Sequence, residues 1–140
     1  MKKRISMICA LALLTTLLFG CAVASEQASV EFTCDDFVSQ NHITRELSVK
    51  AGDSFTVTLC SNPTTGFQWE SAQISDQSVL TETSHQFIGP EEELVGGAGK
   101  DVWTFQGLKK GTSTISIQYS RPWEGGEKGV WTFSAVVTVK

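Results

Sequence analysis

Residues 129–140 read GVWTFSAVVTVK, and this stretch decides the fold. Every second position in it is apolar, and these positions are Trp131, Phe133, Ala135, Val137 and Val139. Alternation with a period of two puts the apolar side chains on one face of an extended chain. The pattern therefore predicts a β-strand with one buried face.

The same period recurs along the rest of the chain. Clear alternation occurs at 43–49, 54–60, 101–107 and 112–120, and weaker strand signals lie at 30–37, 67–71 and 81–88. Residues 76–80 fit a single helical turn, and no longer window has helical period. Seven or eight short strands separated by turn residues predict an all-β fold, an immunoglobulin-like antiparallel β-sandwich. Its core is expected to contain Trp69, Trp103 and Trp131.

The strand at 54–60 is followed by Asn62-Pro63-Thr64-Thr65-Gly66-Phe67. Pro63 has no N–H to donate and pushes Asn62 out of the helical region. Gly66 takes a positive φ at little cost, and the two threonines between are stiff because they are β-branched. We expect a loop fixed in one shape, with small polar side chains at its tip. It is either a plain strand-to-strand turn or a loop that is presented to a partner.

Two further connections interrupt the alternation. Residues 89–100 are long for a sandwich connection and contain Gly96-Gly97-Ala98-Gly99, where another backbone can approach closely. Residues 120–129 contain Arg121-Pro122-Trp123. Trp123 lies outside the alternation of both neighbouring strands, so it is a candidate exposed anchor, because Trp and Arg dominate binding hot spots. The alternative is that Trp123 folds back over the end of the sandwich.

The start of the chain is an export signal. Three basic residues at 2–4 precede an apolar run that reaches Phe19, which is typical of a secretory signal peptide. Residues 18–21, Leu-Phe-Gly-Cys, resemble the lipobox of bacterial lipoproteins and predict a signal peptide over 1–20 with a lipid on Cys21. The alternative is cleavage after residue 24, at Ala-Val-Ala. We expect a tether over 21–29, a domain over 30–140, and a chain that is lipid-anchored at the cell envelope or else secreted or periplasmic.

Charge excludes some partners. The chain has 11 basic and 15 acidic residues, and removal of the signal peptide takes away Lys2, Lys3 and Arg4 but no acidic residue. About 115 residues then remain, enough for one domain with one core. An acidic domain without a basic stripe argues against nucleic acid and against a polybasic membrane contact. Any membrane attachment would come from a lipid on Cys21.

Two of the four cysteines fall within the exported domain, Cys34 and Cys60. Exported domains permit disulfides, and a bridge between these residues would tie the first strand to the strand that precedes the Asn-Pro-Thr-Thr loop. The alternative is two buried thiols at strand ends.

Catalytic signals are absent from the sequence. The only histidines are His42 and His85, and no nucleophile elbow or His-Glu-x-x-His motif occurs. Residues 94–101 resemble a P-loop, but Leu94 replaces the leading Gly and Asp101 replaces the Ser or Thr. A zinc site would have too few ligands, and we expect neither a metal nor a cofactor.

The ordered set of Asn62–Phe67, a Gly-rich loop before a strand with Trp103, and Arg121-Pro122-Trp123 resembles the chagasin family of cysteine-peptidase inhibitors. The resemblance covers residues 43–140. It implies an immunoglobulin-like sandwich with three loops clustered at one end. It also implies a monomer that reversibly inhibits papain-like cysteine peptidases, such as papain or a cathepsin L-type enzyme.

In that interpretation the Asn62–Phe67 loop enters the catalytic cleft, and the other two loops clasp the enzyme on either side. The chain departs from the family pattern by having Phe67 where Tyr is also common, and by the glutamates at 91–93. The alternative function is a lipid-tethered surface module that uses Trp123 to bind a glycan or another protein without inhibiting a peptidase.

Overall fold

The computed structural model describes residues 29–92 and 96–140. The predicted signal peptide, Cys21 and the tether as far as residue 28 lie outside these residues, so the structure does not test them. Ser29, the last residue of the predicted tether, already belongs to the first strand. None of the described helices is long and apolar enough to span a membrane.

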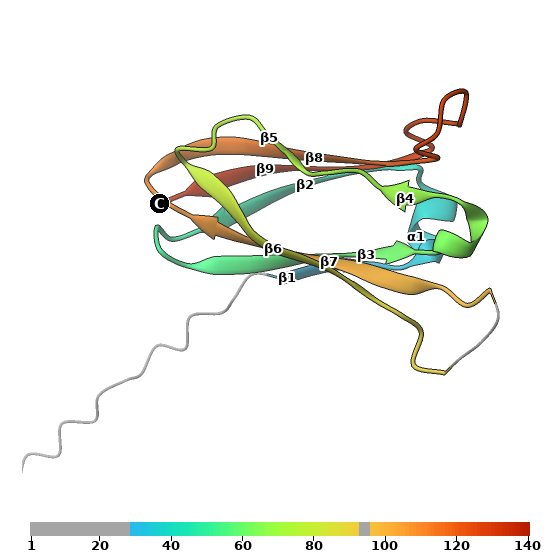
Figure 1. The fold of residues 1–140 in the computed structure, drawn as a ribbon. Helices are drawn as coiled ribbons and strands as arrows, with labels where there is room; N and C mark the ends of the chain where they lie inside the picture. Colours follow the sequence, from blue (N-terminus) through green and yellow to red (C-terminus); the bar gives the residue numbers. More distant parts are fainter. Residues whose placement is uncertain (1–28, 93–95) are drawn as a thin grey trace, which may run out of the picture.

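The described elements form two stacked β-sheets, as the sequence predicts (Figure 1). In chain order they are β1 (Ser29–Phe32), α1 (Cys34–Ser39), β2 (His42–Val49), β3 (Ser54–Ser61), η1 (Pro63–Thr65), β4 (Gln68–Trp69), β5 (Gln73–Ile74), β6 (Leu80–Ile88), β7 (Gly99–Gly107), β8 (Gly111–Ser120) and β9 (Trp131–Val139). Eight of the strands correspond to the sequence-predicted ones, and the additional strand is the two-residue β5. Within 76–80, the expected helical turn is a hydrogen-bonded turn in which the N–H groups of Val79 and Leu80 donate to Asp76 O.

The four-stranded sheet has the order β1-β3-β7-β6, and the five-stranded sheet has the order β2-β9-β8-β4 with β5 also on β8. Most neighbours are antiparallel, but β1 pairs parallel with β3 and β2 pairs parallel with β9. The sequence analysis expected antiparallel strands throughout. The parallel pairs arise because the chain passes from one sheet to the other between β1 and β2 instead of turning back in a hairpin, and local alternation carries no information about this path.

The prediction of one strand over 30–37 is wrong beyond Phe32, because a short helix begins there. Thr33 caps it: the Thr33 hydroxyl accepts from the Asp36 N–H at 3.3 Å, and the Asp36 carboxylate accepts from the Thr33 N–H at 2.7 Å. This is a capping box with Asp in place of the usual Glu or Gln. Hydrogen bonds from the Thr33 N–H and hydroxyl hold the pKa of Asp36 below its ordinary value.

The core lies between the sheets and is made by the alternating faces of β3, β7, β8 and β9. Its largest fully buried side chains include Trp103, Phe55, Phe105, Phe133 and Leu59. Trp69 is also buried, and Trp131 is half-buried against the core, so all three tryptophans lie where the alternation places them. The Trp69 Nε1–H donates to Cys60 O at 2.9 Å, which satisfies its polar edge.

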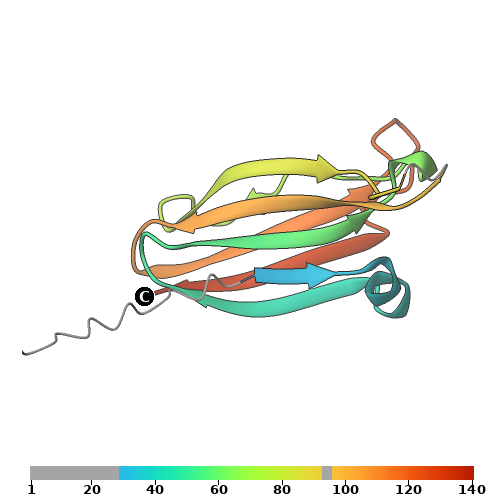
Figure 2. The ribbon, with the colours of Figure 1, turned by 90° about the horizontal axis from the view of Figure 1, so that it is seen from below.

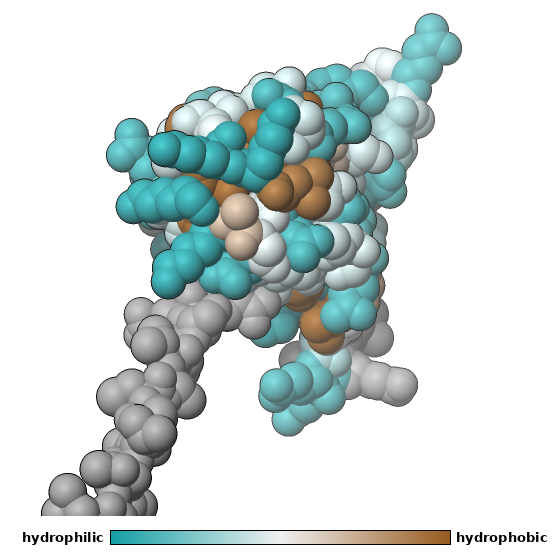
Figure 3. Space-filling view, turned by 90° about the vertical axis from the view of Figure 1, so that its left-hand side faces the viewer, coloured by the Kyte–Doolittle hydropathy of each residue, from teal (hydrophilic) through white to brown (hydrophobic). Residues whose placement is uncertain are grey.

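The sandwich has two ends with different contents. The loop pole is the end where β3 finishes at Ser61 and β9 begins at Trp131, and it carries the connections at 62–67, at 89–98 and at 121–130 together with α1 (Figures 1 and 2). The opposite pole carries the turns at 50–53 and 108–110 and the entry of the chain at Ser29. Figure 3 looks onto this opposite pole, where polar and charged side chains predominate around a small apolar patch.

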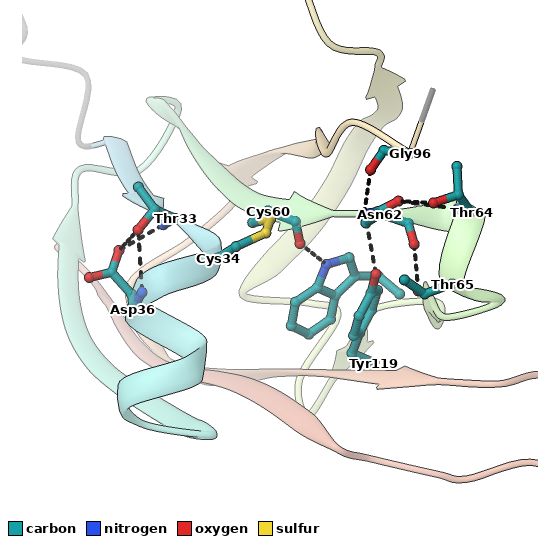
Figure 4. Close-up of a disulfide and its surroundings, with 10 residues drawn as sticks. Thr33, Cys34, Asp36, Cys60, Asn62, Thr64, Thr65, Gly96 and Tyr119 are labelled. Carbon is teal, nitrogen blue, oxygen red and sulfur yellow. Dashed lines mark hydrogen bonds between the residues drawn. A yellow bond between two sulfur atoms is a disulfide. The ribbon is translucent and has the colours of Figure 1, made fainter. Parts of the chain in front are cut away.

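A disulfide joins Cys34 of α1 to Cys60 of β3, with 5.1 Å between the two Cα atoms (Figure 4). That separation lies within the usual range for a bridge. The bond therefore ties the start of α1 to the strand that leads into the 62–67 loop.

We predict that removing this bridge, as Cys34→Ser together with Cys60→Ser, lowers the free energy of unfolding by about 3 kcal/mol. The bridge closes a loop with a sequence separation of 26, and a cross-link of that span restricts the unfolded chain. Urea denaturation of residues 25–140 measures the change. Thiol titration of unfolded, unreduced wild type is expected to find neither cysteine reactive, and finding both reactive would contradict the bridge.

Candidate binding site at the loop pole

The tip of the first loop is the short 3₁₀ helix η1, held by Asn62. The Asn62 Oδ1 accepts from the Thr64 N–H at 3.3 Å and from the Thr64 hydroxyl at 2.6 Å. Asn62 O accepts from the Thr65 N–H and hydroxyl, and Pro63 O accepts from the Gly66 N–H. The loop is therefore fixed in one shape as predicted, and Pro63, Thr64 and Thr65 are exposed at its tip.

Asn62 also joins this loop to its surroundings (Figure 4). Its backbone N–H donates to the Tyr119 hydroxyl at 2.9 Å, which anchors the loop to β8. Its side-chain Nδ2–H donates to Gly96 O at 3.1 Å, which links it to the Gly-rich loop. One asparagine therefore orders its own loop and attaches it to a strand and to a second loop.

The Gly-rich loop is described at 89–92 and from residue 96 onward. Gly96 has a φ of +80°, and Gly97 and Ala98 continue the loop, but Gly99 is already the first residue of β7. The predicted run Gly96-Gly97-Ala98-Gly99 therefore spans the end of the loop and the start of a strand. Residues 93–95, which include the last of the three glutamates, lie outside the described residues.

The third loop packs directly on the first. The Trp123 ring lies over Gly66, since a Cβ on Gly66 would be 2.6 Å from Trp123 Cη2. Trp123 still exposes 51% of its surface, so it folds partly over the first loop and partly faces solvent. The sequence left open whether Trp123 is an exposed anchor or folds back over the end of the sandwich, and each interpretation is partly right.

The Arg121 side chain exposes 35% of its surface and contacts both the first and the third loop. It is half-buried, its guanidinium lies 4.4 Å above the Phe67 ring, and it donates to Thr65 O and Glu127 Oε1 at 3.4 Å each. Arg121 therefore positions the first and third loops, while Pro122 and Trp123 present the surface.

Beneath the loops, stacked rings form a continuous series that we call the aromatic ladder. Phe37 stacks on Trp131 at 5.1 Å, Trp131 on Tyr119 at 4.9 Å, and Tyr119 on Phe67 at 5.5 Å between ring centroids. Arg121 lies on the outer face of Phe67. Sequence analysis placed Trp131 and Tyr119 in the alternation but found no sign that the rings stack beneath the loops.

The same region contains a pocket of about 470 Å³. Its walls come from α1, from the first loop and from the third loop, and include Cys34, Asn62, Thr65, Arg121 and Glu127. No group of three or more metal-ligating side chains occurs among the described residues. The loop pole therefore offers polar and aromatic side chains on braced loops, an arrangement suited to binding another macromolecule.

Comparison with known proteins identifies this arrangement. The family described as "Chagasin family peptidase inhibitor I42" matches residues 48–137. The chain is similar to chagasin of Trypanosoma cruzi, at 29% identity over 92 residues, 63% of this chain and 83% of that protein. It is also similar to amoebiasin-2 of Entamoeba histolytica, at 30% identity over 100 residues, 70% of this chain and 80% of that protein.

Solved structures agree on the fold. The cysteine protease inhibitor EhICP2 of Entamoeba histolytica matches with a TM-score of 0.63 at 23% identity, over 82% of this chain and 98% of that one. PbICP-C, solved in complex with falcipain-2, matches with a TM-score of 0.54 at 18% identity, over 81% and 98%.

The family match, and not the fold alone, defines the class: the chain is a protein of the peptidase-inhibitor type and not an enzyme. This chain belongs to the chagasin family of peptidase inhibitors.

The contact between Gly66 and Trp123 can be tested by the substitution Gly66→Ala. Gly66→Ala adds a Cβ at a φ of +81° and against the Trp123 ring. We expect a loss of about 1–3 kcal/mol in the free energy of unfolding from the strained backbone, and a displaced Trp123 indole. Thermal unfolding and the indole N–H resonances of ¹⁵N-labelled protein measure these effects.

Gly52→Ala is the matched control. Gly52 has a φ of +91° in the turn at the opposite pole, and its Cβ would meet nothing within 4 Å. It is expected to lose stability in the same way and to leave the Trp123 resonance unmoved. An unmoved Trp123 resonance in Gly66→Ala would contradict the packing of these loops.

Proposed function

We propose that this chain inhibits papain-like cysteine peptidases by reversible occlusion of the active-site cleft, one inhibitor to one active site. The observation that carries the proposal is the interlocking of the loops at one pole, since Asn62 bonds to Gly96 and Arg121 bonds to Thr65. Family membership supports it, as does the match to PbICP-C, a protein solved in complex with falcipain-2.

The first loop is suited to the cleft because it resists cleavage. Acyl transfer requires the attacked carbonyl oxygen to enter an oxyanion hole, where N–H donors stabilise the developing charge. In this loop the carbonyl oxygens of Asn62, Pro63 and Thr65 already accept hydrogen bonds from within the protein. A peptidase would have to break these hydrogen bonds before its own N–H donors could bind the same carbonyl oxygens. The 3₁₀ turn also keeps the carbonyl groups out of attack geometry.

The first and third loops need little further ordering when a partner binds. The aromatic ladder and the disulfide fix the first and third loops before a partner arrives, so less conformational freedom is lost in the complex. Thr64 and Thr65 offer hydroxyls and backbone groups to the polar cleft, and Trp123 offers apolar area at its side. An interface of standard size buries about 1,600 Å² in total, which loops spread over one pole can supply.

We further propose that the mature chain is a lipoprotein anchored through Cys21, with a free secreted form as the alternative. The described domain supports an outward orientation. Because β1 runs parallel to β3, the chain enters the domain at the opposite pole. An anchor before Ser29 would therefore leave the loop pole directed away from the membrane.

The inhibitor proposal predicts stoichiometric loss of papain activity when residues 25–140 are titrated against a fluorogenic peptide substrate. Thr64→Ala and Trp123→Ala should each weaken inhibition tenfold or more, because both face the partner. Thr138→Ala, an exposed threonine of β9 near the opposite pole, is the matched control and should change nothing. The wild-type domain should remain uncleaved.

Absence of inhibition of papain and of a cathepsin L-type enzyme, well above micromolar concentration, would overturn the proposal. Binding to a glycan array that is lost in Trp123→Ala and kept in Thr64→Ala would then identify the surface-binding module.

The anchoring proposal predicts that the full chain, expressed in a bacterium, fractionates with membranes and that Cys21→Ser moves it to the soluble exported fraction. Mass spectrometry of the N-terminus gives the second readout. A mature wild-type N-terminus at Ser25 without lipid would establish the secreted form instead.

A further inference from the structure

The segment that joins β1 to β2 precedes the residues that the family model matches by sequence. The match begins at residue 48, whereas α1 spans Cys34–Ser39. The strand registers fix where the helix lies: Phe32 pairs with Leu59 near the end of β3, and His42 pairs with Thr132 near the start of β9. Helix α1 therefore crosses from one sheet to the other at the loop pole, alongside the family's loops (Figures 1 and 2).

Three independent constraints hold α1 in place. The capping box of Thr33 and Asp36 closes its N-terminus, and the disulfide ties Cys34 to Cys60. Phe37 is completely buried and forms the inner end of the aromatic ladder, with tilted packing against Trp69 as well. A helix of six residues would not be stable alone, so these contacts are what make it a rigid surface.

The outward side of this rigid helix is apolar and acidic. Val38 exposes 72% of its surface, more than any other large hydrophobic residue in the described part of the chain, Trp123 included. Asp35 is exposed in the first turn, whereas Asp36 is occupied by the cap, and the last turn has no basic residue. The helix therefore holds one exposed apolar side chain and one exposed carboxylate in a fixed position.

The start of α1 adjoins the first and third loops. The 470 Å³ pocket has Cys34 of α1 on one side and Thr65 and Arg121 of the two loops on the other. A body that covers these loops and closes the pocket also reaches the helix. The opposite pole is separated from α1 by the length of the sheets.

We propose that α1 is a fourth contact element, which rests on the rim of the same peptidase whose cleft the three loops occupy. Val38 packs against an apolar side chain of that rim, and Asp35 faces a neighbouring lysine or arginine. The proposal depends on the inhibitory function proposed above and adds a contact from a segment that precedes the residues matched by the family model. On this proposal, residues 34–39 determine which peptidases are inhibited most strongly among those that have the same cleft but different rims.

The test measures inhibition constants of residues 25–140 for a panel of papain-like peptidases. Val38→Asp is expected to weaken inhibition about tenfold against the best-inhibited enzyme, mainly through faster dissociation. Leu108→Asp is the matched control, because Leu108 is 46% exposed in the turn at the opposite pole. It should inhibit like wild type.

A second pair tests the charge. Asp35→Asn is expected to slow association at low ionic strength and to reduce the salt dependence of the association rate. Glu46→Gln, an exposed carboxylate on β2, should have no such effect. Thermal unfolding of all four variants should stay within a few degrees of wild type, since every substituted side chain is exposed.

The outcomes separate the two proposals. If wild type inhibits, Thr64→Ala is weakened and Val38→Asp equals wild type against every peptidase, the helix is not a contact and the inhibitor function stands. If wild type inhibits none of them, the inhibitor function itself fails. If Val38→Asp instead abolishes a dimer seen by sedimentation and leaves inhibition unchanged, a second copy covers the helix and this inference is overturned.

Discussion

The loop pole depends on the aromatic ladder. Four rings, from Phe37 through Trp131 and Tyr119 to Phe67, stack between the interior and the surface, and the Arg121 guanidinium closes the outer end. Each ring comes from a different segment, so the stack joins α1, β9, β8, the first loop and the third loop. Aromatic pairs contribute beyond their buried area, and here they also determine where the exposed tips of the loops lie.

Some residues of the loop motifs brace the loops and others are exposed, and the motifs themselves do not show which residues do which. Asn62, Phe67 and Arg121 belong to the conspicuous patterns, yet each contacts another part of the loop pole: Asn62 bonds to Gly96, Phe67 stacks on Tyr119, and Arg121 bonds to Thr65. The exposed residues of the same motifs are Pro63, Thr64, Thr65, Pro122 and Trp123. Residues that brace the loops and residues that are exposed at their tips therefore alternate within the same short motifs.

Local sequence was a good guide where one strong signal acted alone. Period-two alternation located the core faces of β3, β7, β8 and β9, because one side of each strand meets the opposing sheet. It misread residues 33–37, since a capping box made with Asp is a weaker signal than the apolar residues around it. It also missed the parallel pairing of β1 with β3 and of β2 with β9, because pairing is decided by where the chain crosses between the sheets.

By itself, the sequence determined the class of fold, the identity of the loops and the stiffness of the Asn62–Gly66 segment, because alternation, proline, glycine and β-branching act within a few residues. The family resemblance implied that the loops cluster at one end, but only the tertiary structure decided how they touch: Arg121 stacks on Phe67, Trp123 lies over Gly66, and α1 shares their pole. Those facts depend on contacts between segments far apart in the chain, and such contacts are set by packing of the two sheets around a common core.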